Sequence, residues 1–194
     1  MSEAYKNRRL ALEFLNVLTT EFGEDIYRNI EIYRNKNGKK VPGPGGAHSN
    51  WTQEQIREKK SSSPIHNCFD IYLKHCKNEN GHLVCVDFDD LDFKNNPLYI
   101  KLYNLKVIET KSKSGCHCYI LVKNLPSYSN EVNVQLPYRD PSNSGDVKCA
   151  TDLISEKINM WEYWEDKYWG LEMRGGQLLS FEWEELKGYF DEMK

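Results

Sequence analysis

Two aspartates stand at the end of a strand-like run of apolar residues. The run covers residues 82–88, and Asp87 and Asp89 lie at its carboxyl end. In an extended strand, side chains two residues apart point to the same face, so these carboxylates project side by side. Two carboxylates this close repel each other unless a cation lies between them, and hard oxygen ligands favour Mg²⁺ or Mn²⁺. The motif predicts a divalent-metal site, whereas the alternative is a surface turn of aspartates that closes a strand.

A polar and basic turn leads into a second strand-like run. Lys113 and Ser114 lie in this turn, Gly115 follows them, and His117 stands in the run itself. The glycine permits an unusual backbone angle or a close approach of the backbone to a neighbour. Lysine, serine and histidine side chains can all donate hydrogen bonds to phosphate oxygens. The pattern predicts a phosphate-binding turn, although a lone histidine in a strand is more often structural.

A third carboxylate opens a further strand-like segment. Asp146 begins this segment, and Lys148 stands two residues later, so the two side chains share a face. A carboxylate for metal beside a cation for phosphate suits chemistry on nucleoside triphosphates. Taken by itself, Asp146 is typical of an ordinary turn.

In this order, the three motifs resemble those of the archaeo-eukaryotic primase superfamily, in its primase-polymerase branch. That family has an apolar strand ending in Asp-x-Asp, then a Ser-x-His strand, then an apolar strand with a further Asp. The similarity covers roughly residues 30 to 155 and includes an upstream lysine-proline and tryptophan entry at 39–42 and 50–52. Here Ser114 stands three residues before His117, and residues 151–154 replace the family's glycine-rich segment.

The resemblance implies a DNA primase or polymerase that uses two divalent metal ions, Mg²⁺ or Mn²⁺. It implies that Asp87, Asp89 and Asp146 are catalytic metal ligands and that His117 contacts the incoming nucleotide. The reaction would be attack of a 3′-hydroxyl, or of an initiating nucleotide, on an α-phosphate. The implied partners are a DNA template and primer, nucleoside triphosphates, and a replicative helicase, fused or separate. The complete set of nucleotide-binding candidates is Lys113, Ser114, His117 and Lys148.

The elements that must position these residues are those of an α+β domain. Apolar residues at helical spacing predict helices over 2–22 and 182–193, and 52–60 is typical of a capped helix. Strand-like runs predict a mixed or antiparallel sheet with flanking helices. The family resemblance implies that this sheet is of the primase-polymerase (RRM-like) type. These runs are 30–33, 70–73, 82–88, 107–110, 116–122, 132–136 and 146–154.

The remaining segments are assigned from local signals. Residues 34–46 are rich in glycine, proline and lysine and are expected to form a loop. Residues 96–105 are ambiguous, with Pro97 well placed at a helix start. Residues 155–168 are expected to continue as a helix. We expect a catalytic domain over 1–155 and a helical, tryptophan-rich extension over 156–194 that packs on it.

Composition is typical of a soluble, globular chain. Its 194 residues are 39% hydrophobic and 28% charged, and no stretch approaches the roughly 18 apolar residues that span a membrane. The N-terminus lacks the apolar centre of a signal peptide, so we expect an intracellular protein, in cytoplasm, nucleus or a viral replication site, not a secreted one. Residues 151–194 hold eleven acidic and five basic side chains, a net charge of −6. Because the whole chain has a net charge of −3, residues 1–150 carry a net charge of +3. This balance is compatible with nucleic-acid binding without requiring it.

The cysteines leave two interpretations. No pair of the six has the spacing of a CxxC knuckle, which favours reduced thiols in the core. Cys85, Cys116 and Cys118 lie in strand-like runs, where cysteine behaves as a small buried hydrophobe. Histidines lie among them, so a zinc site stays open.

Two other functions compete with the primase-polymerase hypothesis. Asp90 followed by Glu109 and Lys111 matches the Asp…Glu-x-Lys pattern of metal-dependent nucleases, in which Glu and Lys share one strand face. That pattern leaves His117 and Asp146 without roles. The other alternative is a non-catalytic nucleic-acid-binding module.

Overall fold

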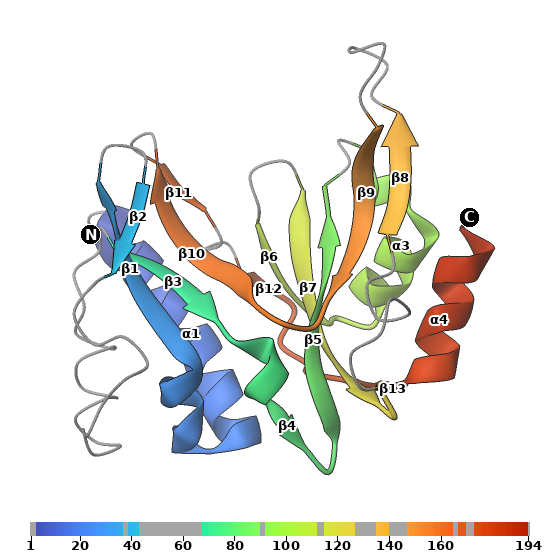
Figure 1. Cartoon of the computed structure of the whole chain (residues 1–194), viewed down its shortest axis with the longest axis horizontal. Helices are drawn as coiled ribbons and strands as arrows, with labels where there is room; N and C mark the ends of the chain where they lie inside the picture. The colour runs from blue at the N-terminus through green and yellow to red at the C-terminus, as the bar shows by residue number, and fades with distance from the viewer. Residues whose placement is uncertain are drawn as a thin grey trace. The chain divides into compact units, whose positions relative to one another are not determined.

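The computed structural model describes residues 3–36, 39–42, 67–89, 92–111, 115–126, 135–139, 147–164, 167–169 and 173–193. The chain forms two compact units, Met1–Lys77 with Glu156–Met173, and Asn78–Ser155 with Arg174–Lys194. Each unit combines helix with sheet, which confirms the predicted α+β class (Figure 1). One junction falls between residues 155 and 156, where the sequence analysis places a boundary. The division into a catalytic domain and an extension stays a prediction.

The first unit consists of a helix and an antiparallel sheet in the order β11-β10-β3-β1-β2. The helix α1, Glu3–Phe22, is confirmed where it was predicted, and it ends at Gly23, whose positive φ of 78° is typical of a glycine after a helix. Short 3-10 helices span Glu24–Asn29 and Leu73–His75. The strands are β1 Ile30–Lys36, β2 Lys39–Pro42, β3 Asn67–Ile71, β10 Ile158–Trp164 and β11 Lys167–Trp169.

Two local predictions in this unit are wrong. The predicted loop over 34–46 contains the end of β1 and all of β2, which pair from Tyr33–Pro42 to Lys36–Lys39. The predicted helix over 155–168 is instead β10 and β11, and β10 pairs with β3. The segment Ile158–Trp164 contains three aromatic residues and one β-branched residue, types that favour strands, and pairing with β3 outweighs a weak helical pattern. The predicted helix over 52–60 and the tryptophan entry at 50–52 lie outside the described residues.

The second unit is built on a larger sheet in the order β12-β6-β7-β5-β9-β8. The pairs β6/β7, β7/β5, β5/β9 and β9/β8 are antiparallel, while β13 adds to β7 in parallel, so the sheet is mixed as predicted. The main strands are β5 Gly81–Phe88, β6 Ile108–Lys111, β7 Cys116–Lys123, β8 Gln135–Arg139 and β9 Val147–Ile154. The short strands are β4 Lys77–Asn78, β12 Met173–Arg174 and β13 Ser180–Glu182.

Two helices cover one face of this sheet. The ambiguous segment 96–105 forms α3, Pro97–Asn104, and Asn96 caps it by accepting hydrogen bonds from the amides of Leu98 and Tyr99 at 2.9 and 3.3 Å. Helix α4, Trp183–Glu192, was predicted, and a short 3-10 helix spans Phe93–Asn95. The core joins both helices to alternate residues of β5 and β7; among its members are Val84, Val86, Phe88, Leu98, Leu102, Cys116, Cys118, Ile120, Trp183, Leu186 and Phe190.

Strand alternation therefore defines two faces of this sheet. Val84, Val86 and Phe88 of β5 belong to the helix-covered face. The intervening residues Cys85 and Asp87 point to the opposite face, because successive side chains of a strand alternate.

Among the described residues, no helix is long and apolar enough to cross a membrane.

Candidate functional site

The strand register brings four polar side chains into one row across the second sheet. Asp87 on β5 lies opposite His117 on β7 and opposite Asp152 on β9. His117 in turn pairs with Thr110 on β6. Directly paired residues point to the same face of a sheet. The row, which we call the polar row, therefore lies on the face opposite α3 and α4.

At the centre of the polar row, a histidine touches the first aspartate of the Asp-x-Asp motif. His117 Nε2 lies 3.3 Å from Asp87 Oδ1, and the two side chains are only 11% and 14% exposed. The contact has the distance of an ion pair but not the alignment of a hydrogen bond, so Asp87 Oδ1 remains without a hydrogen-bond partner among the described residues. The same holds for His117 Nδ1. A buried polar atom left in this state costs about 1–3 kcal/mol, so an ion or polar ligand at the row would lower the energy.

The second aspartate of the motif and the glycine of the turn meet at the end of β5. Asp89 follows β5 and is exposed. A Cβ atom on Gly115 would lie 1.5 Å from the carbonyl oxygen of Phe88 and 3.4 Å from the Cα of Asp89. Of the two roles predicted for Gly115, a close backbone approach is the one that the structure shows. It holds the start of β7 against the strand end that carries both aspartates.

Several predicted site residues cannot be placed. Asp146, Lys113 and Ser114 lie outside the described residues. Lys148 lies on β9, where its backbone pairs with Tyr138, and its side chain is not described. The structure thus brings together Asp87 and His117 from the predicted set, with Asp89 two residues further on.

Asp152 is the residue that the sequence analysis missed. It was grouped with residues 151–154 as a replacement for a glycine-rich segment, although a carboxylate next to the apolar end of a strand, Leu153 and Ile154, is unusual. In β9 it is half-buried and directly opposite Asp87. The useful signal was a second carboxylate in the strand-like run 146–154, but only the pairing of β5 with β9 shows what it faces.

Two neutral side chains, Cys85 and Tyr119, lie near Asp87. Burial raises the pKa of the Cys85 thiol well above its usual range, and the negative charges of Asp87 and Asp89 raise it further. Burial likewise raises the pKa of the Tyr119 phenol. Both groups stay protonated at neutral pH, so among the described residues of the row the carboxylates carry the negative charge. A site of this kind attracts cations.

Glu109 and Lys111, the pair from the nuclease pattern, do not join this row. Glu109 lies opposite Cys118 and so belongs to the helix-covered face, where the hydroxyl of Tyr99 donates to its Oε1 at 3.4 Å. Lys111 is exposed, and Asp90 lies outside the described residues. The described residues therefore place Glu109 on the face opposite Asp87.

Comparison with models of known protein families found no match to this chain. Comparison with curated protein sequences also found no match.

Proposed function

We propose that this chain is a nucleotidyltransferase of the primase-polymerase type that adds nucleoside triphosphates to a DNA strand. The observation that supports it most is the polar row, in which Asp87 is flanked by His117 and Asp152 on neighbouring strands. The order of Asp-x-Asp, then histidine, then a further aspartate along the chain is the order that the family resemblance requires. The mainly antiparallel sheet with helices on one face is compatible with the RRM-like fold of that family.

The donor types present suit a Mg²⁺ or Mn²⁺ ion, although among the described residues Asp87, Asp89 and Asp152 do not form a group with all ligand atoms within 4.8 Å of one another. Asp87 offers a buried oxygen without a hydrogen-bond partner, and Asp89 and Asp152 offer further carboxylates. Hard oxygen donors of this kind suit these ions rather than Zn²⁺. The bound ions would neutralise charge on the triphosphate and lower the barrier to in-line attack.

The protein's own residues then have separate tasks. Asp87 and Asp89 hold the metal, and the third carboxylate is either Asp146, from the family pattern, or Asp152, from the register. His117 would donate a hydrogen bond to a phosphate oxygen of the triphosphate. The turn that contains Lys113 and Ser114 precedes Gly115 and gives further donors to the triphosphate, as does Lys148.

The test is an extension assay on primed and unprimed DNA templates with Mg²⁺ or Mn²⁺. Asp87→Asn and Asp89→Asn should each lower incorporation by about 100-fold or more, since a lost metal ligand removes several kcal/mol of transition-state stabilisation. The matched control is Asp92→Asn, because Asp92 is exposed, accepts a hydrogen bond from Nδ2 of Asn95 and is not part of the polar row. Full incorporation by both single variants would contradict the proposal.

The same assay assigns the third carboxylate. Asp152→Asn and Asp146→Asn are compared under identical conditions, and the ligand is the residue whose loss abolishes incorporation. Cleavage of the labelled template in place of extension would favour the nuclease. Neither extension nor cleavage, with DNA binding retained, would favour the non-catalytic module.

A further inference from the structure

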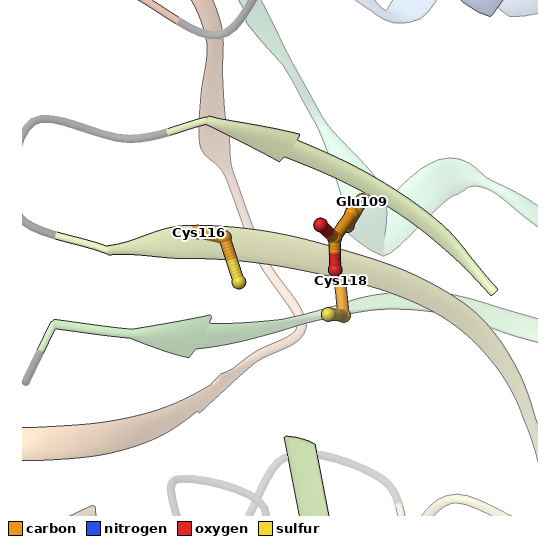
Figure 2. Close-up of side chains that lie close together, drawn as sticks. All are labelled: Glu109, Cys116 and Cys118. Carbon is orange, nitrogen blue, oxygen red and sulfur yellow. The ribbon is translucent and has the colours of Figure 1, made fainter. Parts of the chain in front are cut away.

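Two thiols and a carboxylate meet on the helix-covered face of the second sheet. Cys116 and Cys118 are alternate residues of β7, and Glu109 on β6 lies opposite Cys118. The two sulfur atoms and one carboxylate oxygen of Glu109 all lie within 4.8 Å of one another. Figure 2 shows the three side chains on their neighbouring strands. Cys116 is 4% exposed, Cys118 is 1% exposed and Glu109 is 6% exposed. We call them the thiol cluster.

The spacing of the cluster suits a tetrahedral metal ion. Zinc binds thiolate sulfur at about 2.3 Å and carboxylate oxygen at about 2.0–2.2 Å, which places ligand atoms roughly 3.5–3.8 Å apart. Atoms already within 4.8 Å reach that arrangement by small side-chain rotations. Thiolates select Zn²⁺ over Mg²⁺, so this site differs in chemistry from the polar row.

The carboxylate of the cluster is poorly compensated by the protein alone. Glu109 lies among apolar core residues, and its contacts are long, 3.4 Å to the Tyr99 hydroxyl and 3.6 Å to Nη1 of Arg174. The Arg174 side chain is 57% exposed, so water weakens its attraction. A cation at the cluster would balance this buried charge directly, while Tyr99 would keep the carboxylate oriented from outside.

A disulfide is the other use for two neighbouring cysteines, and strand geometry opposes it. Residues two apart in an extended strand have Cα atoms about 6.6 Å apart, at the upper limit for a disulfide. Both thiols are free and buried. The alternation that makes a disulfide difficult leaves both sulfurs on the same face, as a shared metal ion requires.

We propose that Glu109, Cys116 and Cys118 form a second metal site, which binds Zn²⁺ or another thiophilic divalent ion. Each thiol releases its proton to solvent as its metal–sulfur bond forms, and no group is oxidised or reduced. Three protein ligands leave one tetrahedral position for water. The ion ties β6 to β7, the strand that carries His117 on its other face. This site does not depend on the proposed polymerase activity.

The test is metal binding by the reduced full-length chain. The protein is loaded with Zn²⁺, exchanged into metal-free buffer and assayed for zinc by atomic emission, with one ion per chain expected at this site. Loading with Co²⁺ in place of Zn²⁺ should give the thiolate-to-cobalt charge-transfer absorption, which reports sulfur ligands. Cys116→Ala and Cys118→Ala should each weaken binding by about 100-fold or more, and the near-isosteric Glu109→Gln by at least about tenfold.

Two controls separate this site from other thiols and from the polar row. Cys76→Ala removes a buried thiol of the first unit and should leave the absorption unchanged. Asp87→Asn should also leave it unchanged, so failure of one proposal does not affect the other. Circular dichroism identifies variants that do not fold, and Glu109→Gln remains informative if the cysteine variants are lost. No thiolate–cobalt absorption in the folded reduced protein, or binding that survives in Cys116→Ala, Cys118→Ala and Glu109→Gln, would overturn the proposal.

Discussion

Gly115 is the position where one added methyl group should do most damage to the second sheet. In Gly115→Ala, the new Cβ would lie 1.5 Å from the carbonyl oxygen of Phe88, whereas ordinary contact begins at 3.4 Å. The two backbones must separate by about 2 Å, the difference between these distances. Phe88 pairs with Cys116, the first residue of β7, so the separation opens the end of the β5/β7 pair.

The cost can be estimated from the two effects involved. Forcing extra volume into a packed position costs about 1–3 kcal/mol. One lost backbone hydrogen bond adds about 1 kcal/mol. We therefore expect Gly115→Ala to lower the free energy of unfolding by about 2–4 kcal/mol. Incorporation of nucleotides should also fall, because His117 is only two residues away.

Gly188→Ala is the matched control. Gly188 lies inside α4, and a Cβ atom there would have no neighbour within 4 Å. Alanine is the better helix former by about 1 kcal/mol, so this variant should be more stable than the wild type. Urea unfolding followed by circular dichroism measures both, with separate transitions fitted if the two units unfold independently. A Gly115→Ala variant as stable as the wild type would refute the close approach of β7 to the end of β5.

Three further predictions concern metal binding, nucleotide binding and a buried thiol of the first unit. Mn²⁺ at a free concentration of 100 times its Kd should raise the free energy of unfolding of the wild type by about 2.7 kcal/mol and its Tm by roughly 5–10 °C. Asp87→Asn should lose this shift in Tm. His117→Ala should weaken nucleoside triphosphate binding by about 10-fold to 150-fold, the equivalent of one charge-assisted hydrogen bond. Lys111→Ala should change this affinity little. A larger loss in Lys111→Ala than in His117→Ala would favour the nuclease. Burial raises the pKa of Cys76 from 9.0 to about 12. Between pH 9 and pH 12 the folded thiol keeps its proton while the unfolded thiol loses it. The free energy of unfolding is therefore unaffected by this group below pH 9 and declines from pH 9 to pH 12, by at most about 1.4 kcal/mol per pH unit. Urea titrations at pH 8 and 10 should show a smaller decline for Cys76→Ala than for the wild type.

The local elements of the candidate site could be predicted because their signals are local. The apolar run of β5 ends in carboxylates, and the turn before β7 contains a glycine, so both strand ends were placed correctly from neighbouring residues. The start of α3 was indicated by Pro97, although the segment 96–105 was left ambiguous between helix and other structure. Such features depend on a few consecutive residues.

The partners across the sheet could not be predicted, because pairing and register join distant parts of the chain. Asp152 lies far from Asp87 in sequence, and a shift of one residue in register would turn its side chain to the other face. The strand β10 was missed for a related reason, since its pairing with β3 outweighs local propensity. Whether Asp146 shares the site stays a prediction.

The period of two in strands also decides which β6 residue can serve the polar row. Glu109 and Lys111 share a face with each other, as the nuclease pattern requires, but Thr110 is the residue opposite His117. The same alternation on β7 places His117 on one face and Cys116 and Cys118 on the other. Because Glu109 pairs with Cys118, the acidic residue of β6 is assigned to the thiol cluster. Whatever chemistry the polar row performs, the side chain that β6 contributes to it is a threonine hydroxyl and not a carboxylate.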